Sequence, residues 1–269
     1  MRAWRVPGAV VGPLGDEGPA AAALWEAGAV GVWWVVPDLL GYFPDGARAP
    51  AVDGAWEDAG EGDHVAAYLA GLRPVDAGAV VVAPTHAQVT LRAGQQVVWL
   101  DPGMAFGTGH HETTRLALEA LGRVDVAGRR VLDVGAGSGV LAIAADRLGA
   151  VEAWGVDVDP ETLPVARANA RANRSRARFV EGAFGDVSLA GPFDVVVANL
   201  YAELHVAFLE AYAGLAAAGA DLLLTGVLAP REALVRAALV ARGARAPGLD
   251  LVDERRAGEW CLLHLRRGA

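Results

Sequence analysis

The stretch RVLDVGAGSGVLAIAA, residues 130–145, decides the fold of this chain. A β-branched run reaches Val134, a segment of helical period begins at Val140, and between them lie three glycines at alternate positions, Gly135, Gly137 and Gly139. A strand that turns through glycines into a helix brings backbone N–H groups and a helix N-terminus together, so a ligand can approach closely. A dinucleotide fingerprint requires G-x-G-x-x-G, but Val140 occupies the third glycine position. The G-x-G-x-G spacing indicates S-adenosylmethionine instead, with the three glycines at the cofactor site.

Two acidic residues accompany this loop. Asp157, in WGVDVD at residues 154–159, ends the next strand about 20 residues further on, where a carboxylate can accept hydrogen bonds from both ribose hydroxyls. Asp133 lies two residues before the first glycine, and it either orients the loop from below or binds the amino group of the methionine moiety. Asp159 precedes Pro160 and is expected to cap the following helix.

The chain beyond residue 128 alternates between short β-branched runs and segments of helical period, the pattern of βαβ units. Residues 250–254 and 260–265 break this rhythm, because a short turn joins them and they must therefore pair antiparallel. We predict an α/β fold of the class I (Rossmann-like) methyltransferase type: a mostly parallel seven-stranded sheet with a C-terminal antiparallel hairpin. Strands are expected at 130–134, 153–158, 177–181, 193–198 and 221–227, and helices at 140–148, 160–173, 202–217 and 230–242.

The beginning of the chain differs in character. Residues 1–57 hold five tryptophans among short strand-like runs and an Ala-rich helical stretch at 20–27, which predicts a small α+β domain. A polar, glycine-rich start and a short helical centre predict a linker at 58–73. Residues 74–269 then form the methyltransferase domain, with two further strands expected at 79–83 and 96–100.

Composition limits the class of protein. The chain has 269 residues, 54% of them apolar, but its most apolar stretch, residues 20–36, is too short and too interrupted to span a membrane. Cys261 is the only cysteine, so no intrachain disulfide and no cysteine-cluster metal site is possible. We expect a cytoplasmic protein without a membrane partner. The formal net charge of −9 argues against direct nucleic-acid readout and is compatible with a basic protein partner.

Two further segments carry candidate site residues. ANLY, residues 198–201, presents Asn199 and Tyr201 at the carboxyl end of a strand, where ligands of open α/β sheets bind, although a turn-forming asparagine remains an alternative. DPGMAFGTGHHETTR, residues 101–115, is too elaborate for a plain linker, and we expect it to close over the methionine end of the cofactor. Adjacent histidines rarely converge on one ion, so no metal is expected. The candidates from this segment are Phe106, Gly107, Thr108, His111 and Thr114.

The strings FGTGHHETTR, VLDVGAGSGVLAIAA, GVDVDP and VANLYAEL, in this order, resemble the PrmA family, the methyltransferases of the eleventh large-subunit ribosomal protein. The resemblance covers residues 95–230 closely, and the first domain is similar in length and arrangement to the family's small ferredoxin-like recognition domain. It implies cofactor contacts at Thr114, Gly135, Asp157 and Asn199. It also implies metal-free N-methylation of lysine side chains and of the terminal α-amine of that ribosomal protein.

The reaction needs a neutral amine aligned behind the methyl group, so placement matters more than acid–base chemistry. His110, His111 and Glu112 are candidate proton acceptors, with loop closure and helix start as the competing interpretation. Three alternatives remain: a class I methyltransferase acting on an amide or nucleobase nitrogen, a non-catalytic cofactor-binding protein, and a nicotinamide dehydrogenase, which Val140 disfavours.

Overall fold

A computed structural model divides the chain into two compact units, Met1–Leu72 and Arg73–Ala269. The structure describes residues 2–9, 20, 23–24, 27–29, 31–35, 38–43, 46–58, 73–100, 109, 111–187, 189–243 and 248–268. Residues 59–72, most of the expected linker, lie outside this set. None of the helices in these ranges has the length and apolarity needed to cross a lipid bilayer.

The first unit contains a four-stranded antiparallel sheet. Its strands are β1 (Arg2–Val6), β2 (Gly31–Val35), β3 (Asp38–Phe43) and β4 (Ala55–Asp58), in the order β2-β3-β1-β4. This is the strand order of the predicted ferredoxin-like fold. Residues 20, 23 and 24 of the helix expected at 20–27 are helical. Residues 46–54, which connect β3 to β4, form no helix. Its small core packs Leu24, Leu39 and Phe43 with the edge-on pair Trp4 and Trp56.

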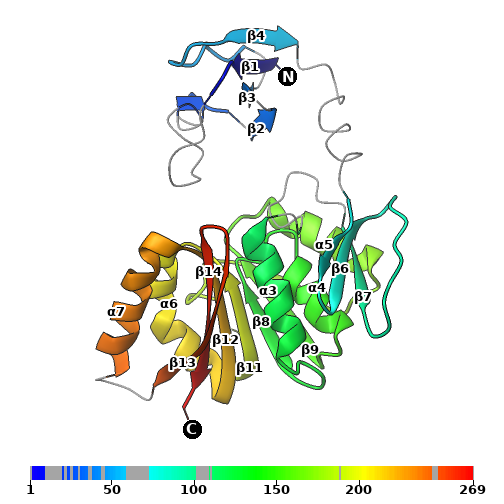
Figure 1. The fold of residues 1–269 in the computed structure, drawn as a ribbon, viewed down its shortest axis with the longest axis vertical. Helices are drawn as coiled ribbons and strands as arrows, with labels where there is room; N and C mark the ends of the chain where they lie inside the picture. Colours follow the sequence, from blue (N-terminus) through cyan, green and yellow to red (C-terminus); the bar gives the residue numbers. More distant parts are fainter. Residues whose placement is uncertain are drawn as a thin grey trace. The chain divides into compact units, whose positions relative to one another are not determined.

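The second unit is built on a seven-stranded sheet with the order β10-β9-β8-β11-β12-β14-β13 (Figure 1). The first five strands in that order run parallel, and β14 joins antiparallel to both β12 and β13. The strand bounds are β8 Arg130–Val134, β9 Glu152–Asp157, β10 Arg178–Glu181, β11 Phe193–Asn199, β12 Ala216–Leu228, β13 Leu249–Ala257 and β14 Trp260–Arg267. The predicted mostly parallel sheet with a terminal hairpin is confirmed.

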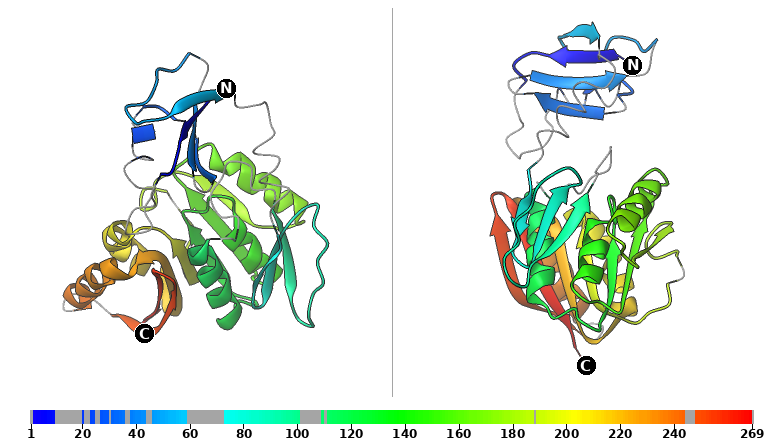
Figure 2. Two further views of the ribbon diagram at one scale, coloured as in Figure 1. Left: turned by 45° about the horizontal axis from the view of Figure 1, so that its top comes forward. Right: turned by 90° about the vertical axis from the view of Figure 1, so that its right-hand side faces the viewer.

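Helices cover both faces of this sheet (Figure 2). One face carries α3 (Glu112–Arg123), α4 (Val140–Arg147) and α5 (Thr162–Ala172), and the other carries α6 (Ala202–Leu215) and α7 (Glu232–Gly243). The central strand β11 separates two cores. Val195 and Val197 belong to the core under α3, α4 and α5, and Val196 and Ala198 belong to the core under α6 and α7. A continuous apolar run is what a strand buried on both faces requires.

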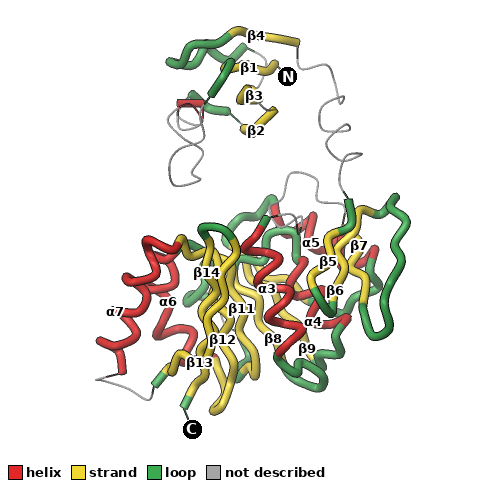
Figure 3. Tube along the Cα trace, in the orientation of Figure 1, coloured by secondary structure: helices red, strands yellow, loops and turns green. Residues whose placement is uncertain are grey.

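A separate three-stranded sheet lies within the second unit, formed by β5 (Val75–Ala77), β6 (Val80–Pro84) and β7 (Gln96–Leu100) (Figure 3). β6 and β7 are the two expected strands and pair in parallel. The sheet is tied to the main one by Asn173, which follows α5. The Asn173 side chain accepts from the Trp99 backbone N–H at 2.7 Å and donates to the Trp99 carbonyl.

Three predicted element bounds are wrong near β12. The helix expected to reach residue 217 ends at Leu215, and the strand expected from residue 221 begins at Ala216. The run AAAGA at 216–220 has the composition of a helix, so the sequence gives no strand signal there. Pairing of Ala216 with Phe193 of β11 overrides this local preference. The helix expected from residue 230 likewise begins at Glu232, after a 3-10 turn at Ala229–Arg231.

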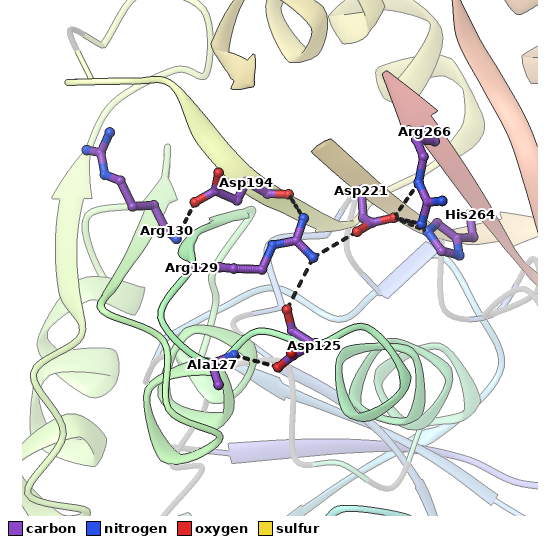
Figure 4. Close-up of polar contacts among 8 residues, drawn as sticks. All are labelled: Asp125, Ala127, Arg129, Arg130, Asp194, Asp221, His264 and Arg266. Atoms are coloured by element: carbon purple, nitrogen blue, oxygen red, sulfur yellow. Dashed lines mark hydrogen bonds and ion pairs between the residues drawn. The ribbon is translucent and has the colours of Figure 1, made fainter. Parts of the chain in front are cut away.

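A charged cluster anchors the amino edge of the parallel strands (Figure 4). The Asp221 side chain is 5% exposed, and its carboxylate accepts from Arg129 at 2.9 Å, His264 at 2.8 Å and Arg266 at 2.8 Å. Arg129 also donates to the backbone carbonyls of Asp125 and Asp194. Burial alone would raise the pKa of Asp221, but the three hydrogen-bond donors outweigh it and hold the pKa below its ordinary value. The cluster therefore joins the loop before β8 to β12 and β14.

We expect Asp221→Asn to destabilise the second unit by about 3 kcal/mol at pH 7, because it leaves two arginines without their shared carboxylate. Since the folded-state pKa is lowered, the carboxylate's contribution is present above its unfolded value and lost as pH falls through the folded one. The difference between wild type and variant in urea denaturation should thus shrink below about pH 4. Glu210→Gln is the control, because Glu210 is 76% exposed in its pair with Arg242; equal losses in both variants would contradict the anchoring role.

Candidate active site

The glycine loop between β8 and α4 has the backbone that the sequence predicts. Gly135, Gly137 and Gly139 have φ values of 77°, 49° and 80°, which side-chain-bearing residues rarely adopt. A Cβ at Gly135 would lie 2.7 Å from Leu200 Cδ2, and one at Gly139 would lie 2.7 Å from Phe179 Cζ. The loop is thus fixed by backbone conformation and by close packing at the same time.

Asp157 at the end of β9 holds this loop directly. Its Oδ2 accepts from the Gly137 N–H at 2.7 Å, and its Oδ1 accepts from the Asp159 N–H at 3.0 Å. Asp159 in turn accepts from the N–H of Glu161, the N-cap residue of α5, so it stabilises the turn that leads into that helix. The loop and Asp157 are therefore joined by a hydrogen bond between neighbouring strands, and the contact of Asp157 with the ribose stays a prediction.

A small hollow lies beside this contact. It is lined by the loop and β9 on one side and by α5 and β10 on the other, including Gly137, Asp157, Leu163, Ala166 and Phe179. At Gly155 a Cβ would lie 2.6 Å from Phe179, so glycine is required for the ring to pack there. The lining side chains fill this hollow almost completely, so only their chemistry can be compared with a ligand. An apolar wall beside a carboxylate suits the base and ribose of S-adenosylmethionine.

Asp133 lies beneath the loop with no exposed surface. Its Oδ2 accepts from the Ala142 N–H in the first turn of α4 at 3.2 Å, whereas Oδ1 has no hydrogen-bond partner among the described residues. Burial raises the pKa of Asp133 to about 7. This contact joins β8 to the helix that follows the loop, and the choice between the two predicted roles of Asp133 stays open.

The raised pKa of Asp133 predicts a pH dependence of stability. Between about pH 4 and pH 7 the unfolded chain loses this proton while the folded chain retains it, so the free energy of unfolding falls as pH rises through that range. Asp133→Asn removes the titration, and we expect the stability difference between wild type and variant to change steadily from pH 4 to 7 and then level off. Urea denaturation followed by circular dichroism measures it; a constant difference would contradict the assignment.

Asn199 ends β11 beside the start of α3. Its Nδ2 donates to Thr113 Oγ1 at 3.0 Å and lies 3.5 Å from Thr114 Oγ1, and both threonines are 1% exposed. Gly226 of β12, at φ 83°, passes close to Asn199, because a Cβ there would lie 2.8 Å from Asn199 Oδ1. The amide nitrogen is thus hydrogen-bonded to α3, and the acceptor-side role of Asn199 stays a prediction.

His111 is the N-cap of α3. Its Nδ1 accepts from the Thr113 N–H at 3.3 Å and lies 2.8 Å from Thr113 Oγ1, and burial lowers the pKa of its ring. The ring packs edge-on against Trp260, with 5.0 Å between centroids. These contacts match the helix-start interpretation. With Nδ1 occupied as an acceptor, a neutral ring carries its proton on Nε2, so they do not support His111 as a proton acceptor, and that role stays a prediction.

Among the remaining predicted residues, the structure describes Tyr201. Tyr201 is the N-cap of α6, makes no side-chain capping bond and is 68% exposed. Phe106, Gly107, Thr108 and His110 lie outside the described residues, and their proposed contacts stay predictions.

Sequence reasoning missed Thr113 and Gly226. Their partner Asn199 is 86 and 27 positions away along the chain, so no local pattern links them. The paired threonines at 113–114 were a usable signal, because hydroxyls in the first turn of a helix often make hydrogen bonds beyond it.

One group of possible metal ligands occurs among the described residues, away from the glycine loop. Glu232, Glu254 and Cys261 bring ligand atoms within 4.8 Å of one another. Arg236 and Arg256 already pair with these carboxylates. Their charges are therefore compensated without a metal, and the absence of a metal stays a prediction.

The glycine loop, the acidic residue at the end of the next strand and the seven-stranded sheet with its reversed hairpin together define a class I S-adenosylmethionine-dependent methyltransferase. Residues 46–268 match the family "Ribosomal protein L11 methyltransferase (PrmA)". The chain is 48% identical over 252 residues to the ribosomal protein L11 methyltransferase of Deinococcus radiodurans, covering 91% of this chain and 92% of that protein. For the enzyme of that name from Thermus thermophilus the identity is 45%, covering 94% and 96%.

The crystal structure of the ribosomal protein L11 methylase from Lactobacillus delbrueckii subsp. bulgaricus superposes with a TM-score of 0.66 at 28% identity, covering 74% of this chain and all of that one. The chain belongs to the ribosomal protein L11 methyltransferase family.

Proposed function

We propose that this chain transfers methyl groups from S-adenosylmethionine to lysine side chains and to the N-terminal α-amine of ribosomal protein L11. One observation carries the proposal beyond the family relationship: α3 binds the amide nitrogen of Asn199 at the same sheet edge as the glycine loop. An amide held in this way turns its oxygen toward other partners, and an oxygen acceptor suits the N–H of an amine.

We assign the cofactor to the carboxyl ends of the parallel strands, next to Gly137. Gly135, Gly137 and Gly139 allow its close approach, and Asp157 accepts from its ribose hydroxyls in addition to holding the loop. Thr114 and the segment with Phe106, Gly107 and Thr108 are assigned to the methionine end. When bound, the sulfonium supplies an already reactive methyl group, so the protein's main task is alignment.

The substrate amine must be neutral to attack. At pH 7 this costs about 4.6 kcal/mol for a lysine of pKa about 10.4 and about 1.4 kcal/mol for an α-amine near 8. Burial of the amine beside Asn199 lowers its pKa by disfavouring the charged form, which offsets part of that cost without a dedicated base. His111 and Tyr201 are the remaining predicted candidates for contact with the amine.

The alternative acceptor is an amide or nucleobase nitrogen. The string Asn199-Leu200-Tyr201 lacks the two prolines expected at the strand end of that group. The net charge of −9 also opposes binding to nucleic acid and favours a basic ribosomal protein, free or assembled, in the cytoplasm where it is made.

The deciding experiment is intact-mass spectrometry of purified L11 incubated with this enzyme and S-adenosylmethionine. We expect additions of 14 Da, reduced at least tenfold in rate by Asn199→Ala, because the variant loses the group that aligns the amine. Calorimetry checks that the wild type and Asn199→Ala both bind the cofactor. Unmodified L11 despite normal cofactor binding would indicate another acceptor.

The first unit is proposed as the part that recognises the substrate protein. A chain beginning at Arg73 retains the second compact unit, so we expect it to bind S-adenosylmethionine like the full chain and to methylate L11 at least tenfold more slowly. Initial rates at low L11 concentration measure the difference. Full methylation activity of the shortened chain would exclude a recognition role for the first unit.

A further inference from the structure

Thr113 stands at the centre of a chain of hydrogen bonds that begins at the helix cap and ends at the acceptor site. Its hydroxyl oxygen lies 2.8 Å from His111 Nδ1 and 3.0 Å from Asn199 Nδ2. Its own backbone N–H also points at His111 Nδ1, at 3.3 Å. The side chain is almost completely buried, so water does not compete for these bonds.

These contacts fix the direction of each proton. Because His111 Nδ1 accepts from the Thr113 N–H, this nitrogen carries no proton of its own. The Thr113 hydroxyl must then donate to Nδ1, which leaves its lone pairs to accept from Asn199. Only the NH₂ group of Asn199 can donate, so the amide nitrogen faces α3 and the amide oxygen faces away from it.

We propose that Thr113 is a positioning residue for methyl transfer: its hydroxyl selects the one orientation of the Asn199 amide that offers the oxygen to the substrate amine. The inference rests on the proposed function and adds a specific residue to it. Without the Thr113 hydroxyl, the amide nitrogen keeps only the 3.5 Å contact with Thr114 Oγ1. The two ends of the amide have nearly the same size and can then exchange places, which would present an N–H donor to the donor groups of the amine.

The surroundings keep this device rigid. Thr225 Oγ1 donates to the Cys261 carbonyl at 3.3 Å and lies 3.5 Å from the Thr113 carbonyl, a distance at which any hydrogen bond to α3 is weak. The Leu200 N–H donates to the Thr225 carbonyl at 3.0 Å, which fixes the backbone after Asn199. Gly226 leaves room for the Asn199 oxygen, because any Cβ there would lie 2.8 Å from it. Thr113 therefore decides the amide's orientation within a backbone that is already fixed.

The test compares Thr113→Val, which keeps the shape and loses the hydroxyl, with Thr113→Ser, which keeps the hydroxyl. The readout is kcat for L11 methylation by intact-mass spectrometry, with cofactor affinity from calorimetry and melting temperature measured alongside. Thr225→Val is the matched control, because it removes an equally buried hydroxyl from the same helix–strand contact without touching the Asn199 side chain. Thr113→Ala replaces the valine variant if that variant does not fold.

We expect Thr113→Val to lower kcat at least tenfold with cofactor affinity changed less than threefold, and Thr113→Ser and Thr225→Val to stay within threefold of wild type. Combined with Asn199→Ala, Thr113→Val should lower kcat by less than a further twofold, because the orienting hydroxyl then has no amide to orient. Asn199→Asp, whose two oxygens are equivalent, serves as the background if the alanine variant is too slow to measure.

Three results would overturn the inference: wild-type kcat in Thr113→Val, equal losses in the valine and serine variants, or a full additional loss in the Asn199 background. A wild-type protein that leaves L11 unmodified, or an Asn199→Ala variant with full activity, would instead refute the proposed function itself. The two failures are therefore distinguishable.

Discussion

The hydrogen bond from the Gly137 N–H to the Asp157 carboxylate, 2.7 Å long, is the contact on which the site depends. It joins the carboxyl ends of two neighbouring parallel strands, and it forms only if the loop after β8 takes its left-handed glycine conformation and β9 pairs in register with β8. Gly155 then lets Phe179 pack against both strands. The loop that we propose for the cofactor is consequently fixed by strand register, glycine geometry and the Asp157 carboxylate.

The local part of this arrangement was predictable from sequence, and the long-range part was not. Strands β8 to β11 and their helices each carry their own periodic pattern, and Asn199 could be selected because a strand end is visible in the residues before it. The start of β12 was missed because an Ala-rich run favours a helix until Phe193 pairs with it. Thr113 was missed for the same kind of reason, since the residue that gives it a role lies 86 positions away.

The two edges of the sheet have different physical characters. The carboxyl edge holds the backbone N–H groups of the glycine loop, the Asn199 amide and the Thr113 hydroxyl. Each of these groups takes part in few hydrogen bonds, so a small molecule can bind there. At the amino edge, the nearly buried carboxylate of Asp221 forms ion pairs with both Arg129 and Arg266. Ion pairs fix the strands at the amino edge. The polar groups at the carboxyl edge are therefore not needed to hold the strands together and can serve ligand binding.

Gly226 lies between the terminal hairpin and Asn199, the residue that we propose for the acceptor side. It lies where the pairing of β12 with β14 shifts register between Leu224 and Val227, and a Cβ at this position would come within 2.5 Å of the Leu200 carbonyl oxygen. That neighbour is backbone, which cannot move aside as a flexible side chain can. A programme that seeks new acceptor specificities by randomising this wall of the site should therefore leave position 226 untouched and place its diversity at the exposed start of α6, around Tyr201 and Leu204.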